Sequence, residues 1–146
     1  MSASPPLDRS VHELPLVAEA GDIDELGHVN NIVYLRWVQD AAVAHWRALA
    51  PAEAQASVAW VVLRHEIDYS RPAMLGDELL ARTWVGVAEG LSFERHTEIV
   101  RRRDGRVLAR ARTVWCPVDI RSGRPRRVTD DLRLLFSTSR ESHEPG

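Results

Sequence analysis

The chain has 146 residues, 45% of them hydrophobic and 27% charged, which is the balance of a single soluble globular domain. Its net charge of −2 excludes a protein that binds polyanions over its whole surface, and no apolar run approaches the ~20 residues that span a bilayer. The stretch "MSASPPLDRS" lacks the basic start and apolar segment of a secretory signal, and Cys116 is the only cysteine. These features exclude an internal disulfide and a cysteine-based metal cluster. We expect a cytoplasmic protein with no membrane partner.

Two elements are predicted in the first third of the chain. Residues 11–19 alternate loosely between apolar and polar positions, which favours a strand. Residues 30–49 predict a helix whose polar side chains occupy one narrow arc, and a helix that is apolar over most of its circumference is buried. Asn30 is its expected N-cap, and Pro51 prevents a simple continuation. His45 lies on the apolar face, where we expect a hydrogen-bonded core histidine.

The rest of the chain predicts four strands and a short final helix. The Asp104-Gly105 pair between two alternating runs is a strong hairpin signal. Thr129 is a suitable N-cap for a helix at 129–136. We interpret the four strands as a meander over 58–69, 78–88, 91–102 and 107–120.

The order of these elements predicts an α+β fold. We expect one domain over 1–146, with a core at about 10–136 and flexible tails at 1–10 and 138–146. One face of a five-stranded sheet cannot cover a helix that is apolar nearly all round. The surplus apolar surface therefore predicts a partner subunit.

Arginine is unevenly distributed along the chain. All nineteen Lys and Arg positions are arginine, and residues 95–133 contain twelve arginines against five acidic residues. A biased genome composition is one explanation for the lack of lysine, and a role of arginine in phosphate binding is the other. Guanidinium groups suit phosphate, so this half is a candidate phosphate surface. No nucleic-acid-binding motif accompanies the charge, however, and we expect no nucleic-acid partner.

Polar side chains crowd the start of the buried helix, in the stretch "DIDELGHVNNIVYLRW" at 22–37. A second motif, "IDYSRPAMLGDEL", follows at 67–79, and a third, "VDIRSGRP", at 118–125. With these motifs the chain resembles the hot-dog-fold acyl-CoA thioesterases, in particular the 4-hydroxybenzoyl-CoA thioesterase-like family, over about residues 10–136. The resemblance implies a hot-dog fold, with a five-stranded antiparallel sheet wrapped around one long buried helix and a short C-terminal helix.

The resemblance also implies an activity and an assembly. The expected reaction is hydrolysis of an acyl-CoA or acyl carrier protein thioester to the free acid and the thiol, without a cofactor. The expected assembly is a homodimer or homotetramer, in which two subunits form a continuous sheet with active sites between them.

The resemblance assigns catalytic roles to three residues. Asp24 matches the general base or nucleophile of the family motif, since a carboxylate can activate water or attack a thioester directly. The backbone N–H of Asn31 would polarise the thioester carbonyl, because a helix N-terminus presents free N–H groups and a positive dipole end. His28 matches a histidine of the plant acyl-carrier-protein thioesterases, although Leu26 replaces the asparagine of their motif. Asp22 is expected to order the turn.

Substrate contacts are expected from residues around the same helix start. Glycine allows a tight turn or a close approach of the substrate, and the tryptophans at 37, 60, 84 and 115 either line an acyl tunnel or pack the core. The expected substrate-binding residues are Gly27, Asn30, Tyr34 and Arg71. The candidates for CoA phosphate contacts are Arg71, Arg95, Arg101, Arg102 and Arg103.

Several other chemistries find no support in the sequence. The six histidines show no metal-ligand spacing, so no metal site is expected. There is no G-x-S-x-G nucleophile motif and no glycine-rich phosphate loop. Two alternatives stay open: an acyl-thioester hydratase or dehydratase on the same fold, and a non-catalytic acyl-CoA-binding module. By spacing alone, Asp24 fits a turn or capping acid better than a catalytic one, and only the whole motif reverses this preference.

Overall fold

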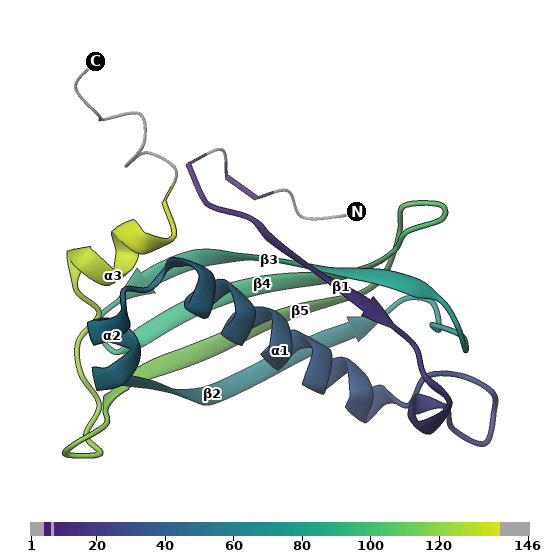
Figure 1. Cartoon of the computed structure of the whole chain (residues 1–146), viewed down its shortest axis with the longest axis horizontal. Helices are drawn as coiled ribbons and strands as arrows, with labels where there is room; N and C mark the ends of the chain where they lie inside the picture. Colours follow the sequence, from purple (N-terminus) through teal and green to yellow (C-terminus); the bar gives the residue numbers. More distant parts are fainter. Residues whose placement is uncertain (1–4, 7, 138–146) are drawn as a thin grey trace.

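The computed structural model describes residues 5–6 and 8–137 (Figure 1). In chain order the elements are β1 (His12–Val17), the 3-10 helix η1 (Ala20–Asp22), α1 (Asn31–Leu49), α2 (Ala52–Ser57), β2 (Val58–Tyr69), β3 (Glu78–Glu89), β4 (Ser92–Arg101), β5 (Arg106–Asp119) and α3 (Asp130–Leu135). Of the tails predicted at 1–10 and 138–146, residues 1–4, 7 and 138–146 lie outside the described residues. At the inner end of the first predicted tail, the Ser10 N–H donates to the Phe136 carbonyl at 2.8 Å. The flexibility of both tails stays a prediction.

The five strands form one antiparallel sheet in the order β1-β3-β4-β5-β2, which confirms the predicted fold class. The predicted four-strand meander is wrong for β2, which pairs with β5 and not with β3. The connection at 70–77 is too long for a tight hairpin. It passes beneath the start of α1, where the Val29 N–H donates to the Ala73 carbonyl at 2.9 Å. β1 occupies the position beside β3.

The long helix α1 lies across one face of this sheet (Figure 1). Asn30 caps its N-terminus as predicted, by accepting a hydrogen bond from the Ile32 N–H at 3.1 Å. The sequence did not predict α2, because a six-residue segment after Pro51 is too short to show a helical period. Thr129 caps α3 as predicted, with its hydroxyl oxygen 3.3 Å from the Leu132 N–H.

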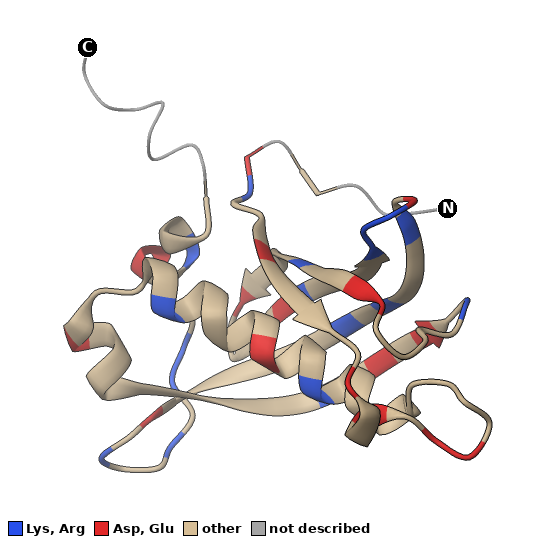
Figure 2. Ribbon diagram, turned by 45° about the vertical axis from the view of Figure 1, so that its right-hand side comes forward, with Lys and Arg blue, Asp and Glu red and all other residues tan. Residues whose placement is uncertain are grey.

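The opposite face of the sheet carries rows of paired charges. Glu98 is 2% exposed and lies 3.4 Å from Arg82 and 3.5 Å from Arg110 on the two neighbouring strands. Arg112 similarly contacts Glu94 at 2.5 Å and Glu66 at 2.8 Å. Figure 2 shows acidic and basic segments side by side on the strands. These cross-strand ion pairs account for part of the arginine excess, so the arginine-rich half is not one continuous phosphate surface.

Candidate active site

The loop before α1 gives two neighbouring acids different environments. Asp22 is 7% exposed, and its two carboxylate oxygens accept hydrogen bonds from Arg36 Nη2 at 2.9 Å and from the Glu19 N–H at 3.0 Å. Burial alone would raise the pKa of Asp22, but these donors and the charge of Arg36 hold it below its ordinary value of 3.8. Asp22 therefore orders the turn, as the sequence predicted.

Asp24 is half-buried and is held by the backbone of its own loop. Its Oδ1 accepts hydrogen bonds from the N–H groups of Leu26 at 2.9 Å and His28 at 3.1 Å. The loop can close in this way because Gly27 adopts a φ of +82°, which a residue with a Cβ rarely adopts. Within the described residues, Oδ2 has no hydrogen-bond partner. Asp24 therefore stabilises its own turn, as the structural alternative expects. Its carboxylate is also held in one orientation, with Oδ2 not bonded to any described residue.

The start of α1 carries the second candidate group, the backbone N–H of Asn31. Asn30 uses its own N–H to contact the Asp22 carbonyl at 2.8 Å, and its side chain caps the Ile32 N–H. In the part of the chain that the structure describes, the Asn31 N–H has no acceptor. It lies at the positive end of a 19-residue helix, where an oxygen that becomes anionic is stabilised.

These groups meet at one cavity of about 400 Å³. Six of the seven predicted site residues line it, and only Gly27 does not. Gly27 instead shapes the loop behind it. The lining residues are Asp24, Leu26, His28, Val29, Asn30, Asn31, Tyr34, Tyr69, Ser70, Arg71 and Pro72.

Tyr69 is a lining residue that the sequence reasoning did not single out. Its hydroxyl donates to the Asn31 carbonyl at 3.2 Å, and its ring stacks on Tyr34 with centroids 5.2 Å apart. The buried Tyr34 hydroxyl accepts a hydrogen bond from the Ala73 N–H at 2.8 Å and so anchors the 70–77 connection to α1. The sequence does contain a signal for Tyr69, because this residue belongs to the second motif, "IDYSRPAMLGDEL".

The candidate phosphate-binding arginines occupy different places. Arg71 is exposed, lines the cavity and has no ion pair among the described residues. Arg101 pairs with Asp104 at 2.7 Å. Arg102 and Arg103 are exposed beyond the end of β4 and do not line the cavity. Arg95 is 4% exposed and faces a second cavity instead.

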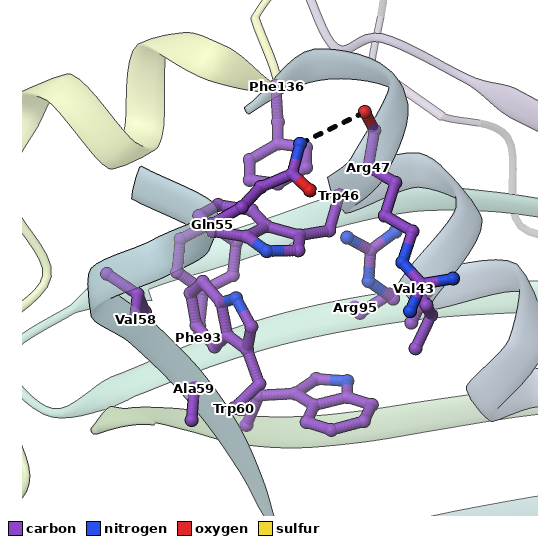
Figure 3. A pocket seen from close by; sticks show the side chains of 12 residues that line it. Val43, Trp46, Arg47, Gln55, Val58, Ala59, Trp60, Phe93, Arg95 and Phe136 are labelled. Carbon is purple, nitrogen blue, oxygen red and sulfur yellow. Dashed lines mark hydrogen bonds between the residues drawn. The ribbon is translucent and has the colours of Figure 1, made fainter. Parts of the chain in front are cut away.

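This second cavity, of about 320 Å³, lies beside the C-terminal half of α1 (Figure 3). Two of the four tryptophans proposed for an acyl tunnel, Trp60 and Trp115, line it, whereas Trp37 belongs to the core and Trp84 stacks on His96. The lining residues are Ala42, Val43, Trp46, Arg47, Gln55, Val58, Ala59, Trp60, Phe93, Arg95, Trp115 and Phe136.

His45 is the hydrogen-bonded core histidine that the sequence predicted. It is 1% exposed, with Nδ1 2.9 Å from Arg95 Nη1 and Nε2 3.1 Å from the Ser10 hydroxyl. Since a guanidinium can only donate, Nδ1 is the acceptor and the ring is neutral with its proton on Nε2. Burial, followed by the charges of Arg95 and His12, lowers the pKa of His45 to about 3.

The described residues contain neither a cluster of metal ligands nor a helix that could span a membrane. Among residues 5–6 and 8–137, no group of three or more His, Cys, Asp or Glu side chains is placed to hold a metal ion. In the same residues, no helix has both the length and the hydropathy needed to cross a membrane.

Comparisons with known proteins agree with this architecture. Over 116 residues, the chain is 27% identical to the long-chain acyl-CoA thioesterase FadM of Escherichia coli (strain K12), covering 76% of this chain and 86% of FadM. A thioesterase from Thermus thermophilus, solved in complex with coenzyme A and Zn, is 25% identical, with a TM-score of 0.75 over 90% of this chain and 94% of that one.

A 4-hydroxybenzoyl CoA thioesterase mutant, solved in complex with 4-hydroxybenzoyl CoA, shares the fold at 20% identity. Its TM-score is 0.79, over 87% of this chain and 99% of that one. The family model of the thioesterase-like superfamily matches residues 18–136, which is most of the chain and includes all the cavity-lining residues at the start of α1. The chain belongs to the thioesterase-like superfamily.

Proposed function

We propose that this protein hydrolyses acyl-CoA thioesters at the cavity beside the start of α1. The observation that carries the proposal is the arrangement of Asp24, whose Oδ1 is fixed by two backbone N–H groups while no described residue bonds to Oδ2. Asn31, whose N–H has no acceptor among residues 5–6 and 8–137, lines the same cavity. A carboxylate and a helix N-terminus at one cavity are the two groups that hydrolysis of a thioester needs.

In the proposed reaction the thioester carbonyl oxygen accepts a hydrogen bond from the Asn31 N–H. Asp24 then acts in one of two ways. As a general base, it removes a proton from water while the water oxygen forms a bond to the carbonyl carbon. As a nucleophile, it forms an acyl anhydride that water hydrolyses. In both cases the C–S bond breaks, the thiolate takes up a proton, and the products are a carboxylic acid and CoA.

The other cavity residues have supporting roles in this proposal. The backbone N–H of His28 donates to Asp24. His28 is half-buried and lines the cavity, where its side chain can contact the substrate. Tyr34 and Asn30 position the walls. The exposed guanidinium of Arg71, which forms no ion pair with a described residue, is the best-placed candidate at this cavity for a CoA phosphate.

The assembly proposed for this function is a homodimer that forms through β2. This strand is at the edge of the sheet and exposes Val61, Leu63 and Tyr69 by 47%, 58% and 43%. An exposed edge strand presents unpaired backbone N–H and C=O groups that can pair with a strand of another chain. Because Tyr69 both ends this strand and lines the cavity, pairing of two β2 strands would place the active sites next to the subunit interface.

A hydrolysis screen tests the proposal. Purified protein is offered acyl-CoA thioesters from acetyl to palmitoyl, together with 4-hydroxybenzoyl-CoA and an enoyl-CoA, and thiol release is followed with a colorimetric thiol reagent. The proposal requires thiol release from at least one thioester. Hydration of the enoyl-CoA without thiol release would favour the hydratase alternative, and binding without turnover would favour the non-catalytic module. A parallel comparison with acyl carrier protein thioesters decides between the two carriers. Cytoplasmic location stays a prediction.

A further inference from the structure

The second cavity is separate from the proposed catalytic cavity. The helix residues that line it are Ala42, Val43, Trp46 and Arg47, whereas Asn31 and Tyr34 line the first. At 1.5 Å per residue, Asn31 and Trp46 are about 22 Å apart along α1. No residue lines both cavities. The second cavity is therefore a distinct place on the molecule.

The charge at this cavity comes from Arg95. Its side chain is almost completely buried, yet within the described residues no carboxylate lies within ion-pair distance of it. Nη1 is satisfied by two neutral acceptors, His45 Nδ1 at 2.9 Å and the Thr83 hydroxyl at 3.0 Å. The guanidinium also lies 5.3 Å from the centre of the Phe136 ring. None of these contacts supplies a negative charge.

An unpaired buried cation is unusual, because burying a charge is costly unless an opposite charge accompanies it. This protein obeys that rule elsewhere on the same strand. Glu98, three residues further along β4, is equally buried and lies between Arg82 and Arg110. Burial lowers the pKa of Arg95 to about 9, which still leaves it charged at neutral pH. Arg95 therefore has a charge that no described residue balances.

Unused hydrogen-bond donors gather at the same cavity. Among the described residues, no acceptor contacts Nε or Nη2 of Arg95. The indole N–H groups of Trp60 and Trp115 also lack a partner among these residues, but they are buried in the wall and expose almost no surface. Arg47 adds a second guanidinium without an ion pair in the described chain, on the same side of the cavity in Figure 3. Aromatic rings form most of the remaining wall (Figure 3). The cavity thus combines an apolar surface with donors and positive charge.

We propose that this second cavity binds a free carboxylic acid with an apolar body, with the carboxylate on Arg95 and the body against Trp46, Trp60 and Phe93. A carboxylate is the anion whose two oxygens match the planar donors of a guanidinium. It would provide the negative charge that Arg95 lacks. This inference rests on the proposed function, because thioester hydrolysis releases a free acid of this class. The site would therefore sense or retain the product away from the reacting centre.

Binding measurements on the whole protein test this inference without any turnover. Decanoate and 2-naphthoate are titrated by calorimetry and by tryptophan fluorescence, with 1-decanol as the uncharged partner of decanoate. At least one acid should quench the fluorescence, and decanoate should bind at least ~10-fold more tightly than 1-decanol, the effect of a charge-assisted hydrogen-bond pair. Failure of both acids to bind, or equal binding of decanoate and 1-decanol, would overturn the proposal.

Variants locate the site. Arg95→Met should remove the preference for decanoate over 1-decanol, whereas Arg47→Gln, at an exposed position, should weaken decanoate binding by less than ~3-fold. Circular dichroism checks that Arg95→Met is folded. If this variant does not fold, the comparison of decanoate with 1-decanol binding to the wild-type protein decides whether the bound carboxylate meets a positive charge. Asp24→Asn should bind decanoate as wild type does. Loss of binding in Asp24→Asn, or displacement of decanoate by CoA alone, would place the acid in the catalytic cavity and contradict the inference.

These outcomes are distinguishable from those of the proposed function. A protein that binds decanoate through Arg95 but releases no thiol from any thioester would keep the site and lose the activity. A protein that hydrolyses thioesters but binds neither acid outside the catalytic cavity would keep the activity and lose the site.

Discussion

The charged side chains near the two ends of α1 have opposite environments. At the N-terminal end an acid sits in a half-exposed loop, and backbone N–H groups fix its direction without neutralising it. At the C-terminal end the buried cation Arg95 lies over the Phe136 ring, and no carboxylate of the described residues pairs with it. The first arrangement suits a step in which charge moves between water, substrate and carboxylate. The second suits recognition of a charge that stays in place, because a buried ion interacts strongly with a matching partner.

The largest expected effect is at the N-terminal end. Asp24→Asn keeps the oxygen that accepts from Leu26 and His28 but removes the negative charge. We expect kcat to fall by about 100-fold or more, the scale for loss of a general base. Thiol release under saturating acyl-CoA measures it. Asp40→Asn, which neutralises an exposed acid on the same helix, serves as the control and should retain wild-type turnover. Equal turnover in Asp24→Asn and wild type would remove Asp24 from its proposed role.

The next effect is at the other end and concerns stability. Because the pKa of His45 is held at about 3 in the folded state and is about 6.5 when unfolded, only the unfolded chain gains this proton near pH 5. The stabilisation is complete above pH 6.5 and is lost progressively as the pH falls toward 3. Linkage predicts a loss of about 2 kcal/mol in unfolding free energy between pH 7 and pH 5. Urea unfolding at the two pH values measures this loss.

Two variants separate His45 from other groups that titrate in this range. His45→Gln should flatten the difference between pH 7 and pH 5, because glutamine does not titrate. His65→Gln removes a half-buried histidine on β2 whose pKa burial also lowers, and it should remove less of the difference. An unchanged difference in His45→Gln would mean that the buried Arg95–His45 pair does not set the pH dependence.

The sequence predicted the N-terminal end of α1 much better than the C-terminal end. The helix expected at 30–49 is observed at Asn31–Leu49, and the polar motif before it lies at a cavity, because a cap, a turn glycine and a helix period are local signals. The charge on Arg95 was instead read as a phosphate contact on the surface. Nothing local shows that Arg95 points inward, since this depends on the register of β4 against β3 and β5 and on the packing of α1 and Phe136 over it.

The pairing of β2 could not be predicted from the sequence for a similar reason. Consecutive strands usually pair, so β2 was placed beside β3. The pairing of β2 with β5 is a contact between residues about 50 positions apart, such as His65 and Thr113. The second motif contained the explanation, because its Pro72 and Gly76 mark a connection that runs under the helix start and not a hairpin. Tyr69 was overlooked with it, since the site role of that residue follows only from this crossing.

The smallest effect expected here concerns the cap at the start of α1. Asn30→Ala removes the acceptor for the Ile32 N–H and should lower the unfolding free energy by about 1 kcal/mol, measured by urea unfolding. Asn30→Asp restores the acceptor and should recover the stability, but it adds a negative charge beside the N–H that is proposed to meet the oxyanion. We therefore expect Asn30→Asp to be stable and less active, and Asn30→Ala to be less stable yet nearly as active per folded molecule. If both variants lost activity equally, the side chain of Asn30 would contact substrate in addition to capping the helix.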